Sequence, residues 1–526
     1  MKWSPSRVSG FVCPVAAFFL ACACPAGAIT VSVGPLTVVN GPDSPVPADA
    51  KCLADDNGWL YRQSEVEPSV AADPTDPSRL VASYQQDRWN NGAAQETGIV
   101  TSSDGGLTWT PTVVPYQICL GGSSQRVSDP WVTVSPDGTM YQMVLFYNLS
   151  FTSPASRTEG MAVVRSTDHG ATWSAPVILD SEPTPTSGQS YLHTPLHDKN
   201  TLTADPNDSR YVYAVWDNVA VITGKQKTMF TRTTDGGRTW EPARMIYNPA
   251  KDLGTSVAFT QGHVIRVLPD GTLVDLMMRF WPKRNGRQAS LTYTNVDTNF
   301  DVVVIRSADR GRTWTGKATR VSPQLDAYVF TPHGNFVRSG DSTPTLAVDS
   351  ANGNLYAAWQ DTDSPQGAAK IRISVSRDGG RRWSSPVTAS QTPSTAHAFN
   401  PGLAVTGSGI VALTYYDFRN YDSVHGGPAS TDAWLAAFSD DGSTLHFEEE
   451  ARLTAASFDI EQAPWAGGYF LGDYEGLAAV GNDVHAVFVT TLGNGPDFQP
   501  SPDNFDVEIS DVNQTDVFHR TITLEP

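Results

Sequence analysis

The stretch Thr233–Trp240, TTDGGRTW, contains no obvious catalytic group, yet closely similar strings recur along the chain. Its aspartate can accept hydrogen bonds from backbone amides of a turn, and its glycines can adopt a positive φ. Alternating apolar residues precede the string, as in a strand, and the tryptophan opens the returning strand, where its ring can pack on a neighbouring sheet. The string therefore predicts a β-hairpin that stabilises a fold.

The chain contains five close copies of this hairpin string and one degenerate copy. Their nearly constant spacing indicates a repeat architecture. A second repeated element, strand, turn and strand, occurs seven times, from PSVAADPTDPSRLVASYQQD at Pro68 to EGLAAVGNDVHAVFVTT at Glu475. The hairpin strings are SSDGGLTW (102–109), STDHGATW (166–173), TTDGGRTW (233–240), SADRGRTW (307–314), SRDGGRRW (376–383) and the degenerate SDDGSTLHF (439–447).

Repeated four-stranded units arranged around an axis form a β-propeller. We expect an all-β fold with a single propeller of four-stranded blades, of which seven are favoured and six are the alternative. Residues 1–28 are expected to form a signal peptide, residues 29–60 an N-terminal segment, and residues 61–526 the propeller. Within the N-terminal segment, ITVSVGPLTVV (29–39) could pair with the last blade and close the ring, which removes an exposed sheet edge.

The hairpin string resembles the Asp-box, or BNR, repeat of the sialidase superfamily over roughly residues 60–490. The resemblance implies a propeller fold and an activity directed at glycans. Asp-box repeats also occur in lyases, in other glycosidases and in propellers without catalysis. A divergent, non-sialidase member of the superfamily is therefore the alternative to a sialidase.

Charge and targeting signals limit the partners and the compartment. A net charge of −19 argues against nucleic acid or anionic lipid as a partner, because phosphate binding needs a surface rich in Lys and Arg. Lys2 and Arg7 flank the start of an apolar stretch, residues 11–24, and Ala26-Gly27-Ala28 fits a signal-peptidase site. The stretch is too short to span a bilayer, and no later segment qualifies. We expect a secreted monomer, extracellular or periplasmic, rather than a lipoprotein anchored through Cys22.

Removal of the signal peptide leaves two cysteines, Cys52 and Cys119. In an exported protein, an even pair of this kind can form a disulfide. Two free buried thiols are the alternative.

Propellers generally bind ligands at one mouth of the central axis, where the starts of the innermost strands converge. The Asp-box hairpins are expected on the opposite face. In this sequence, almost every unit brings an ionisable residue to the start of its first strand, and the ends of the second strands add more polar residues. The strand starts carry Glu67, Asp129, Asp198 with Lys199, His263, Asp341, Asn400 and Asp473, and the strand ends carry Asp87-Arg88, Tyr147-Asn148, Asp217, Arg279, Asp361 and Asp417 with Arg419.

The sialidase resemblance implies three arginines on the substrate carboxylate, a tyrosine nucleophile assisted by glutamate, and an aspartate acid/base. The arginine motif usual near the N-terminus of sialidases is absent here. Topology offers Arg88, Arg279 and Arg419 as a carboxylate clamp. The catalytic candidates are then Tyr474 with Glu67, Asp129 and His263, and the substrate-binding candidates are completed by Asp198, Asp341 and Asp473.

Three functions fit this mouth. The first is a secreted glycosidase acting on an acidic sugar terminus of a glycan or polysaccharide. The second is a polysaccharide lyase that uses His and Tyr while a cation neutralises a uronate, and the third is a non-catalytic propeller that binds glycan or protein. No cofactor is expected to be required. Ca²⁺ is an optional ligand of the acidic ring, because it prefers oxygen atoms, although no loop has EF-hand or RTX spacing.

Overall fold

The computed structural model describes residues 1, 29–41, 43–47, 52, 58–148, 158–183, 196–220, 225–283, 298–325, 327–341, 343–493 and 507–526. Except for Met1, the predicted signal peptide lies outside these ranges. The described chain is built almost entirely from β-strands. Its helical segments are short and include α1 (Pro249–Leu253) and the 3-10 turns η2 (Ile118–Leu120) and η4 (Ile460–Gln462).

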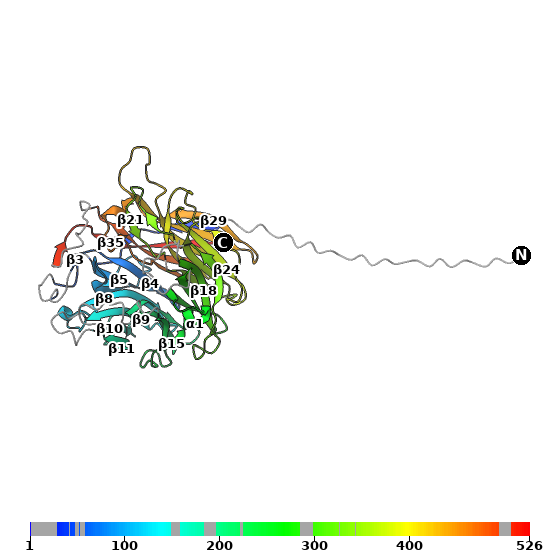
Figure 1. Ribbon diagram of the computed structural model, residues 1–526, viewed down its shortest axis with the longest axis horizontal. Coiled ribbons are helices and arrows are strands. Elements are labelled where there is room, and N and C mark those ends of the chain that lie inside the picture. Colours follow the sequence, from blue (N-terminus) through cyan, green and yellow to red (C-terminus); the bar gives the residue numbers. More distant parts are fainter. Residues whose placement is uncertain are drawn as a thin grey trace.

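The innermost strands form a closed ring. Each one contacts the next along the chain, and the last, β32, contacts the first, β4. The sequence colours in Figure 1 accordingly run around the molecule from blue through green and orange to red. The innermost strands are β4 (Val66–Asp73), β8 (Arg126–Val134), β12 (Leu196–Ala204), β16 (Phe259–Val267), β22 (Thr345–Val348), β26 (Ala398–Val405) and β32 (Gly476–Val480).

Each innermost strand leads outward into an antiparallel sheet. The second strands are β5 (Asp76–Trp89), β9 (Met140–Asn148), β13 (Val212–Ala220), β17 (Leu273–Pro282), β23 (Leu355–Asp361), β27 (Val411–Asp417) and β33 (Asp483–Thr491). The third strands are β6 (Ala94–Ser102), β10 (Thr158–Ser166), β14 (Lys225–Thr233), β18 (Thr298–Ser307), β24 (Lys370–Ser376), β28 (Ser430–Asp440) and β35 (Thr515–Glu525). The outer strands are β7 (Thr110–Thr112), β11 (Val177–Pro183), β15 (Arg244–Tyr247), β19 (Thr319–Gln324), β25 (Val387–Thr388), β29 (Leu445–Arg452) and β1 (Thr30–Val33).

The described strands thus form seven four-stranded groups around one axis. The prediction of an all-β propeller is confirmed, and the grouping agrees with the favoured blade number. Apolar side chains fill the spaces between adjacent blades: one core cluster, for example, combines Met143 and Leu145 of β9 with Ala214 and Trp216 of β13. Packing between blades therefore supplies the hydrophobic core.

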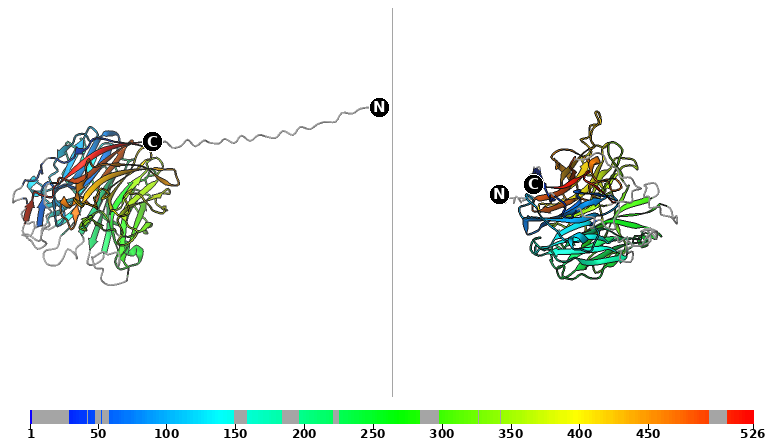
Figure 2. Two further views of the ribbon diagram at one scale, coloured as in Figure 1. Left: turned by 90° about the horizontal axis from the view of Figure 1, so that it is seen from above. Right: turned by 90° about the vertical axis from the view of Figure 1, so that its left-hand side faces the viewer.

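The two ends of the chain close the ring together. β1 pairs with β35 from Thr30 opposite Glu525 to Val33 opposite Ile522, and β2 (Thr37–Val38) pairs with the same strand. The side views in Figure 2 show the red strand beside blue N-terminal strands. This is the closing pairing that the sequence predicts for residues 29–39.

The Asp-box hairpins connect third strands to outer strands. In the hairpin of blade three, Asp235 Oδ1 accepts from Thr239 N at 2.9 Å and Asp235 Oδ2 accepts from Thr239 Oγ1 at 2.6 Å. Gly237 has a φ of 76°, and a Cβ there would lie 2.6 Å from the Tyr141 ring of the preceding blade. The hairpin therefore needs glycine both for its turn and for its close contact with the neighbouring blade.

The strand pairing places these hairpins at one end of the propeller. Ala204, at the end of β12, lies opposite Val212, and Val212 lies opposite Thr233, where the hairpin begins. The start of β12, at Leu196, is at the other end of the same sheet. The hairpins and the predicted mouth are consequently on opposite faces.

Two additions accompany the ring. Cys52 and Cys119 form a disulfide with a Cα–Cα distance of 5.4 Å, which ties the N-terminal segment to the loop after β7. The hairpin of β20 (Val329–Phe330) and β21 (Phe336–Arg338) is inserted between blades four and five and pairs with β31 (Tyr469–Phe470), which precedes β32, to form a small three-stranded sheet.

Candidate functional site

Five inner strands share a bulge near their starts, where the pairing with the second strand shifts register. A positive φ is uncommon for residues other than glycine, and such residues concentrate at functional sites. Bulges also re-aim side chains. The residues with positive φ in these bulges are Glu67 (53°), Asp129 (49°), Lys199 (49°), Gly262 (72°) and Asn400 (53°).

Three of these side chains meet at the mouth, around one ammonium group. Lys199 Nζ is 2.5 Å from Asp473 Oδ2, 3.7 Å from Asp129 Oδ2, 3.8 Å from Glu67 Oε1 and 3.9 Å from Asp198 Oδ1. We refer to these five residues as the Lys199 cluster. The Lys199 side chain is 7% exposed and that of Asp198 is 40% exposed. Asp198 is therefore the carboxylate of the cluster that a substrate can reach most directly.

Hydrogen bonds from neighbouring strands fix the buried carboxylates. Gln85 Nε2 donates to Glu67 Oε2 and, at 3.0 Å, to Ser128 Oγ. Ser128 Oγ in turn donates to Asp129 Oδ1 at 2.8 Å, and the backbone N–H of Lys199 donates to Asp129 Oδ2 at 3.1 Å. The cluster is therefore preorganised, because protein donors hold its carboxylates.

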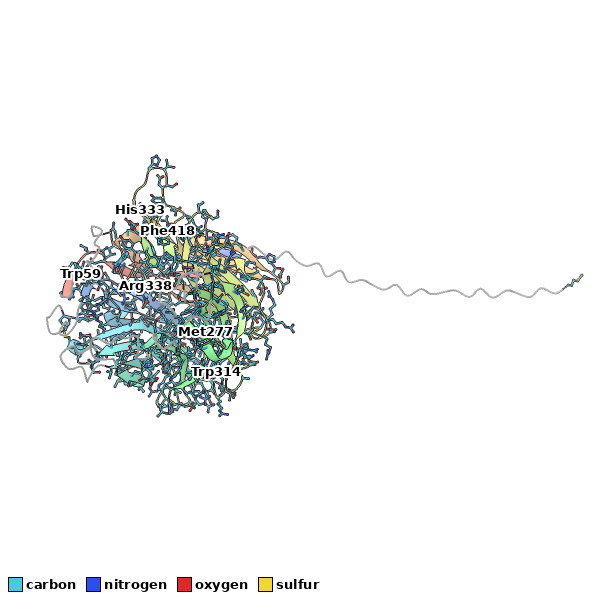
Figure 3. The ribbon with its side chains drawn as sticks, in the orientation of Figure 1. Trp59, Met277, Trp314, His333, Arg338 and Phe418 are labelled. Carbon is cyan, nitrogen blue, oxygen red and sulfur yellow. A yellow bond between two sulfur atoms is a disulfide. The ribbon has the colours of Figure 1, made fainter. Side chains whose placement is uncertain are left out.

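Arg338 adds a second cation to Asp473. Its Nε donates to Asp473 Oδ1 at 3.1 Å and its Nη2 donates to Oδ2 at 2.6 Å, a bidentate pair. The guanidinium lies 4.5 Å from the centre of the Phe470 ring, and the guanidinium of Arg88 lies 4.9 Å from the same centre. The Arg338 side chain is 34% exposed. Figure 3 shows Arg338 inside the ring of blades, with His333 nearer the rim.

The surroundings shift the pKa values of Glu67, Asp198 and Asp473 in opposite directions. Burial raises the pKa of Glu67 to about 8, although Lys199 partly offsets it. The Asp198 side chain is 40% exposed, but partial burial, with the negative charges of Asp129 and Asp217, still outweighs Lys199 and raises the pKa of Asp198 to about 7. Burial would also raise the pKa of Asp473, but Arg338 and Lys199 outweigh it and hold that pKa far below its usual range. One site thus contains carboxyl groups that keep a proton near neutrality and one that stays ionised, an arrangement suited to acid/base chemistry.

Tyr474 does not form the predicted nucleophile pair with Glu67. Its hydroxyl donates to the carbonyl of Pro130 at 3.2 Å, and its ring packs edge-on against Trp131 at 5.3 Å. Burial, followed by the charges of Glu67 and Asp129, raises the Tyr474 pKa well above its usual value. The phenol therefore stays protonated, and in the described residues no hydrogen bond links it to a base.

His263, predicted to be catalytic, is buried behind the mouth. Its Nδ1 contacts Asp275 Oδ2 at 2.9 Å and its Nε2 contacts Asp217 Oδ1 at 3.0 Å, and its side chain is 0% exposed. Burial lowers its pKa, but the two aspartates outweigh burial and raise it to about 10. The imidazolium neutralises two buried carboxylates, which is a structural role. Asp217 in turn lies opposite Asp198 in the strand pairing, so the ion pair supports the mouth from behind.

The arginine clamp predicted from Arg88, Arg279 and Arg419 is corrected by the structure. Arg279 binds Asp252 and Asp301, each at 2.8 Å. Arg419 binds Asp417 and Glu450, each at 2.5 Å, within blade six. Carboxylates of the protein thus occupy both guanidinium groups. Arg88 alone of the three lies beside the Lys199 cluster, where burial lowers its pKa to about 10.

The structure therefore combines Glu67, Asp129, Asp198, Asp473 and Arg88 of the predicted set. Asp341 is half-buried between β21 and β22, and its backbone carbonyl accepts from Gln324 Nε2 at 3.4 Å. Sequence reasoning missed Arg338 and did not include Lys199 among the site residues. Lys199 follows Asp198 at a predicted strand start, and this position could have identified Lys199 as a site residue from the sequence. Arg338 comes from the inserted hairpin, for which the repeat pattern offers no equivalent.

Two cavities lie between the inner strands, and the smaller one adjoins the cluster. A cavity of about 40 Å³ lies among Lys199, His263, Pro401 and Tyr474. A larger one of about 340 Å³ occupies the channel between the inner strands and is lined mainly by small and β-branched residues. Within the described residues, no group of three or more His, Cys, Asp or Glu side chains could hold a metal ion. None of the described helices has the length and apolar character that a membrane crossing requires.

Comparisons with known proteins agree with the Asp-box repeat found in the sequence. Residues 78–327 match the family model described as BNR repeat-like domain, which confirms the Asp-box resemblance for this part of the chain. A xyloglucanase from Paenibacillus sp is 27% identical over 199 residues, which cover 36% of this chain and 17% of the relative. The chain spans less than a fifth of the length of the curated relatives it matches.

Solved structures to which the chain is similar include those of two enzymes. The intramolecular trans-sialidase from Ruminococcus gnavus is 13% identical, with 81% of this chain and 90% of that chain covered and a TM-score of 0.37. The polysaccharide lyase Uly1 is 9% identical, with 88% and 90% covered and a TM-score of 0.48. Residues 78–327 of the propeller thus match the BNR repeat-like model, and the chemistry of the protein has to be argued from its own site.

Proposed function

We propose that the protein is a secreted glycoside hydrolase whose reaction site is the mouth of the propeller at the Lys199 cluster. One observation carries the proposal: four carboxylates surround a single ammonium, and the pKa values of Glu67 and Asp198 are raised whereas that of Asp473 is lowered. Glycosidases need one carboxyl group that donates a proton to the leaving oxygen and one that remains ionised.

The roles follow from exposure and protonation. Asp198 is the general acid, because it is the most exposed carboxyl of the cluster and its pKa is raised to about 7. Asp129 is the second carboxylate of the pair, acting as a base or stabilising positive charge on the sugar. Both carboxylates reach the same ammonium, so their nearest oxygens lie within about 8 Å of each other. That limit is compatible with the spacing of about 5 to 9.5 Å between the two carboxyl groups of glycosidases.

Charge at the mouth favours an acidic sugar. When Glu67 and Asp198 are protonated, the cations Lys199, Arg338 and Arg88 exceed the remaining carboxylates of the cluster. Arg338 is the most accessible of these cations. Asp473 occupies its Nε and Nη2, but its Nη1 makes one long contact, 3.4 Å to the carbonyl of Ala466, and guanidinium groups recognise carboxylates well. The substrate we propose is therefore an acidic sugar in a glycan or polysaccharide, bound through Arg338 rather than through a sialidase-type arginine clamp.

Product analysis on a panel of neutral and acidic polysaccharides tests this function. New reducing ends without an unsaturated product support hydrolysis, whereas ultraviolet absorbance of an unsaturated uronyl product would instead establish a lyase. Arg338→Gln is expected to weaken turnover of acidic substrates more than that of neutral ones. Binding without any product would leave a non-catalytic glycan-binding propeller.

Secretion is supported by the predicted signal peptide and by the Cys52–Cys119 disulfide, since disulfides persist in oxidising compartments. N-terminal sequencing of the exported protein is expected to begin at Ile29. A monomeric state and Ca²⁺ binding to the acidic ring also remain predictions. Light scattering and calorimetric titration with Ca²⁺ test them.

A further inference from the structure

The small inserted sheet has two unlike faces. Pairing places Phe330 opposite Phe336 and Arg338 opposite Phe470. Because paired residues point to the same side of a sheet, these four side chains share one face. The other face carries Val329, Val337 and Tyr469, which are buried in the core.

The face with Phe330 is unexpectedly aromatic. A sheet that packs one face on a core normally presents polar residues on the other. Here Phe330 is 44% exposed and Phe336 is half-buried. The Phe336 ring lies 5.8 Å from that of Phe330 and 6.1 Å from that of Tyr328. Adjacent aromatic rings on an accessible sheet face beside a candidate site can contact a ligand there.

Polar contacts hold the hairpin β20–β21 at both ends. At its tip, Glu461 accepts hydrogen bonds from Thr331 Oγ1 and from Asn335 Nδ2, the latter at 3.0 Å. Glu461 Oε2 also contacts His333 Nδ1 at 3.0 Å. At its base, Arg338 forms the bidentate pair with Asp473. A platform fixed in this way loses little conformational freedom when a ligand binds.

The aromatic face also leads directly to the candidate site. Phe330, Phe336 and Arg338 follow one another across the same face, and Arg338 binds the Asp473 carboxylate that also contacts Lys199. A sugar that reaches Arg338 would place its next residue over the hairpin. Aromatic rings suit the apolar faces of sugar rings, and the arginine supplies polar contacts, a combination common in ligand sites.

We propose that the outer face of β20–β21 is a glycan-binding subsite, in which Phe330 and Phe336 stack against sugar residues beyond the bond being cleaved. This inference rests on the proposed function of the mouth and deepens it, because it makes the substrate an oligosaccharide or polysaccharide chain. A single terminal sugar on a small leaving group would leave the platform unused.

Substitution of the two rings tests the subsite. Phe330→Ala and Phe336→Ala are expected to lower kcat/KM on long-chain substrate by about tenfold, as for an aromatic anchor of a binding site. Turnover of the shortest cleavable substrate is expected to remain unchanged. Phe447→Ala is the matched control, because Phe447 is 43% exposed on the outer strand β29. Equal loss on short and long substrates, or no loss on either, would overturn the subsite.

A second measurement separates the subsite from the catalytic proposal. If the wild-type protein releases no product from any polysaccharide, the proposed hydrolase function fails. Affinity electrophoresis in gels containing each polysaccharide then tests the platform alone. A glycan-binding face without hydrolysis is supported if the gel retards the wild type and Phe447→Ala but no longer retards Phe330→Ala. Equal mobility of all three proteins would overturn the subsite.

Discussion

The two ends of the same blades are built on opposite principles. At the hairpin end, blade after blade repeats one aspartate turn, and each aspartate bonds within its own turn. At the mouth end, equivalent bulge positions carry glutamate, aspartate, lysine, glycine and asparagine, and the side chains of Glu67, Asp129 and Lys199 contact residues of other blades. Repetition at equivalent positions thus accompanies a structural role, and chemical divergence accompanies the candidate site.

The carboxyl groups of the two ends also differ in protonation. Hydrogen bonds from the hydroxyl and backbone of Thr108 lower the pKa of Asp104 to about 2, and Thr172 does the same for Asp168. At the mouth, burial raises the pKa of Glu67 to about 8. The hairpin carboxylates are solvated and permanently charged. The mouth contains groups whose charge changes near neutrality, which is what acid/base chemistry requires.

The largest effect is expected from Lys199→Met. The substitution removes the ammonium that offsets four carboxylates, three of them buried, and breaking a buried ion pair costs about 3 to 5 kcal/mol. We expect a loss of about 3 kcal/mol in the free energy of unfolding, measured by urea denaturation at neutral pH. Lys227→Met on the exposed face of β14 is the control and is expected to change little. If the two variants have the same free energy of unfolding, the Lys199 ammonium does not stabilise the fold through the carboxylates around it.

The next effect concerns the acid. Asp198→Asn is expected to lower turnover by about 100-fold or more, the usual contribution of a general acid. In the wild type, activity is expected to fall as pH rises through about 7, because the raised pKa means that the proton is lost there. A pH–rate profile measures this limb. Asp270→Asn, in an exposed turn at the hairpin end, is the control, and full activity of Asp198→Asn would remove Asp198 from the mechanism.

The fold was more accessible to sequence reasoning than the site. Each Asp-box hairpin is encoded locally, by an aspartate and glycines within eight residues, so the strings specified the blades and their hairpins. The site depends on long-range contacts. Nothing local to Arg279 indicates that Asp301, on the next strand, occupies its guanidinium, or that Asp217 and Asp275 enclose His263. Arg338 lies in an insertion, where the repeat gives no guide to position.

The hairpin end also contains buried titratable groups, and the third prediction concerns them. His485 of β33 and His519 of β35 are stacked, with Nδ1 and Nε2 3.1 Å apart, and His519 Nδ1 also contacts the carbonyl of Gly106. Burial lowers their pKa values to about 4 and about 3. The negative charge of Asp483 partly opposes this shift at His485. These contacts join the last blade to the first.

Because these pKa values lie below the unfolded value of about 6.5, the histidines stabilise the fold above that pH, and the contribution is lost as pH falls. Between pH 7 and pH 5 the wild type is expected to lose about 1 to 2 kcal/mol more stability than His485→Phe. Denaturation at both pH values measures the difference, with His446→Phe, an exposed histidine, as control. If all three proteins lose the same stability between the two pH values, the His485–His519 pair is not an acid-sensitive contact between the last blade and the first.

The smallest effect is expected at the hairpin itself. Asp235→Ala removes the acceptor for the backbone N–H and the hydroxyl of Thr239. The turn is largely accessible to water, which replaces part of these bonds, so the expected loss is about 1 kcal/mol in the free energy of unfolding. Activity per folded molecule is expected to equal that of the wild type, because the hairpin lies at the end opposite to the Lys199 cluster. Denaturation curves and turnover, measured on the same preparation, check both expectations. Unchanged stability with lost activity would reverse the comparison, since the repeated aspartate would then serve function and the divergent mouth would not.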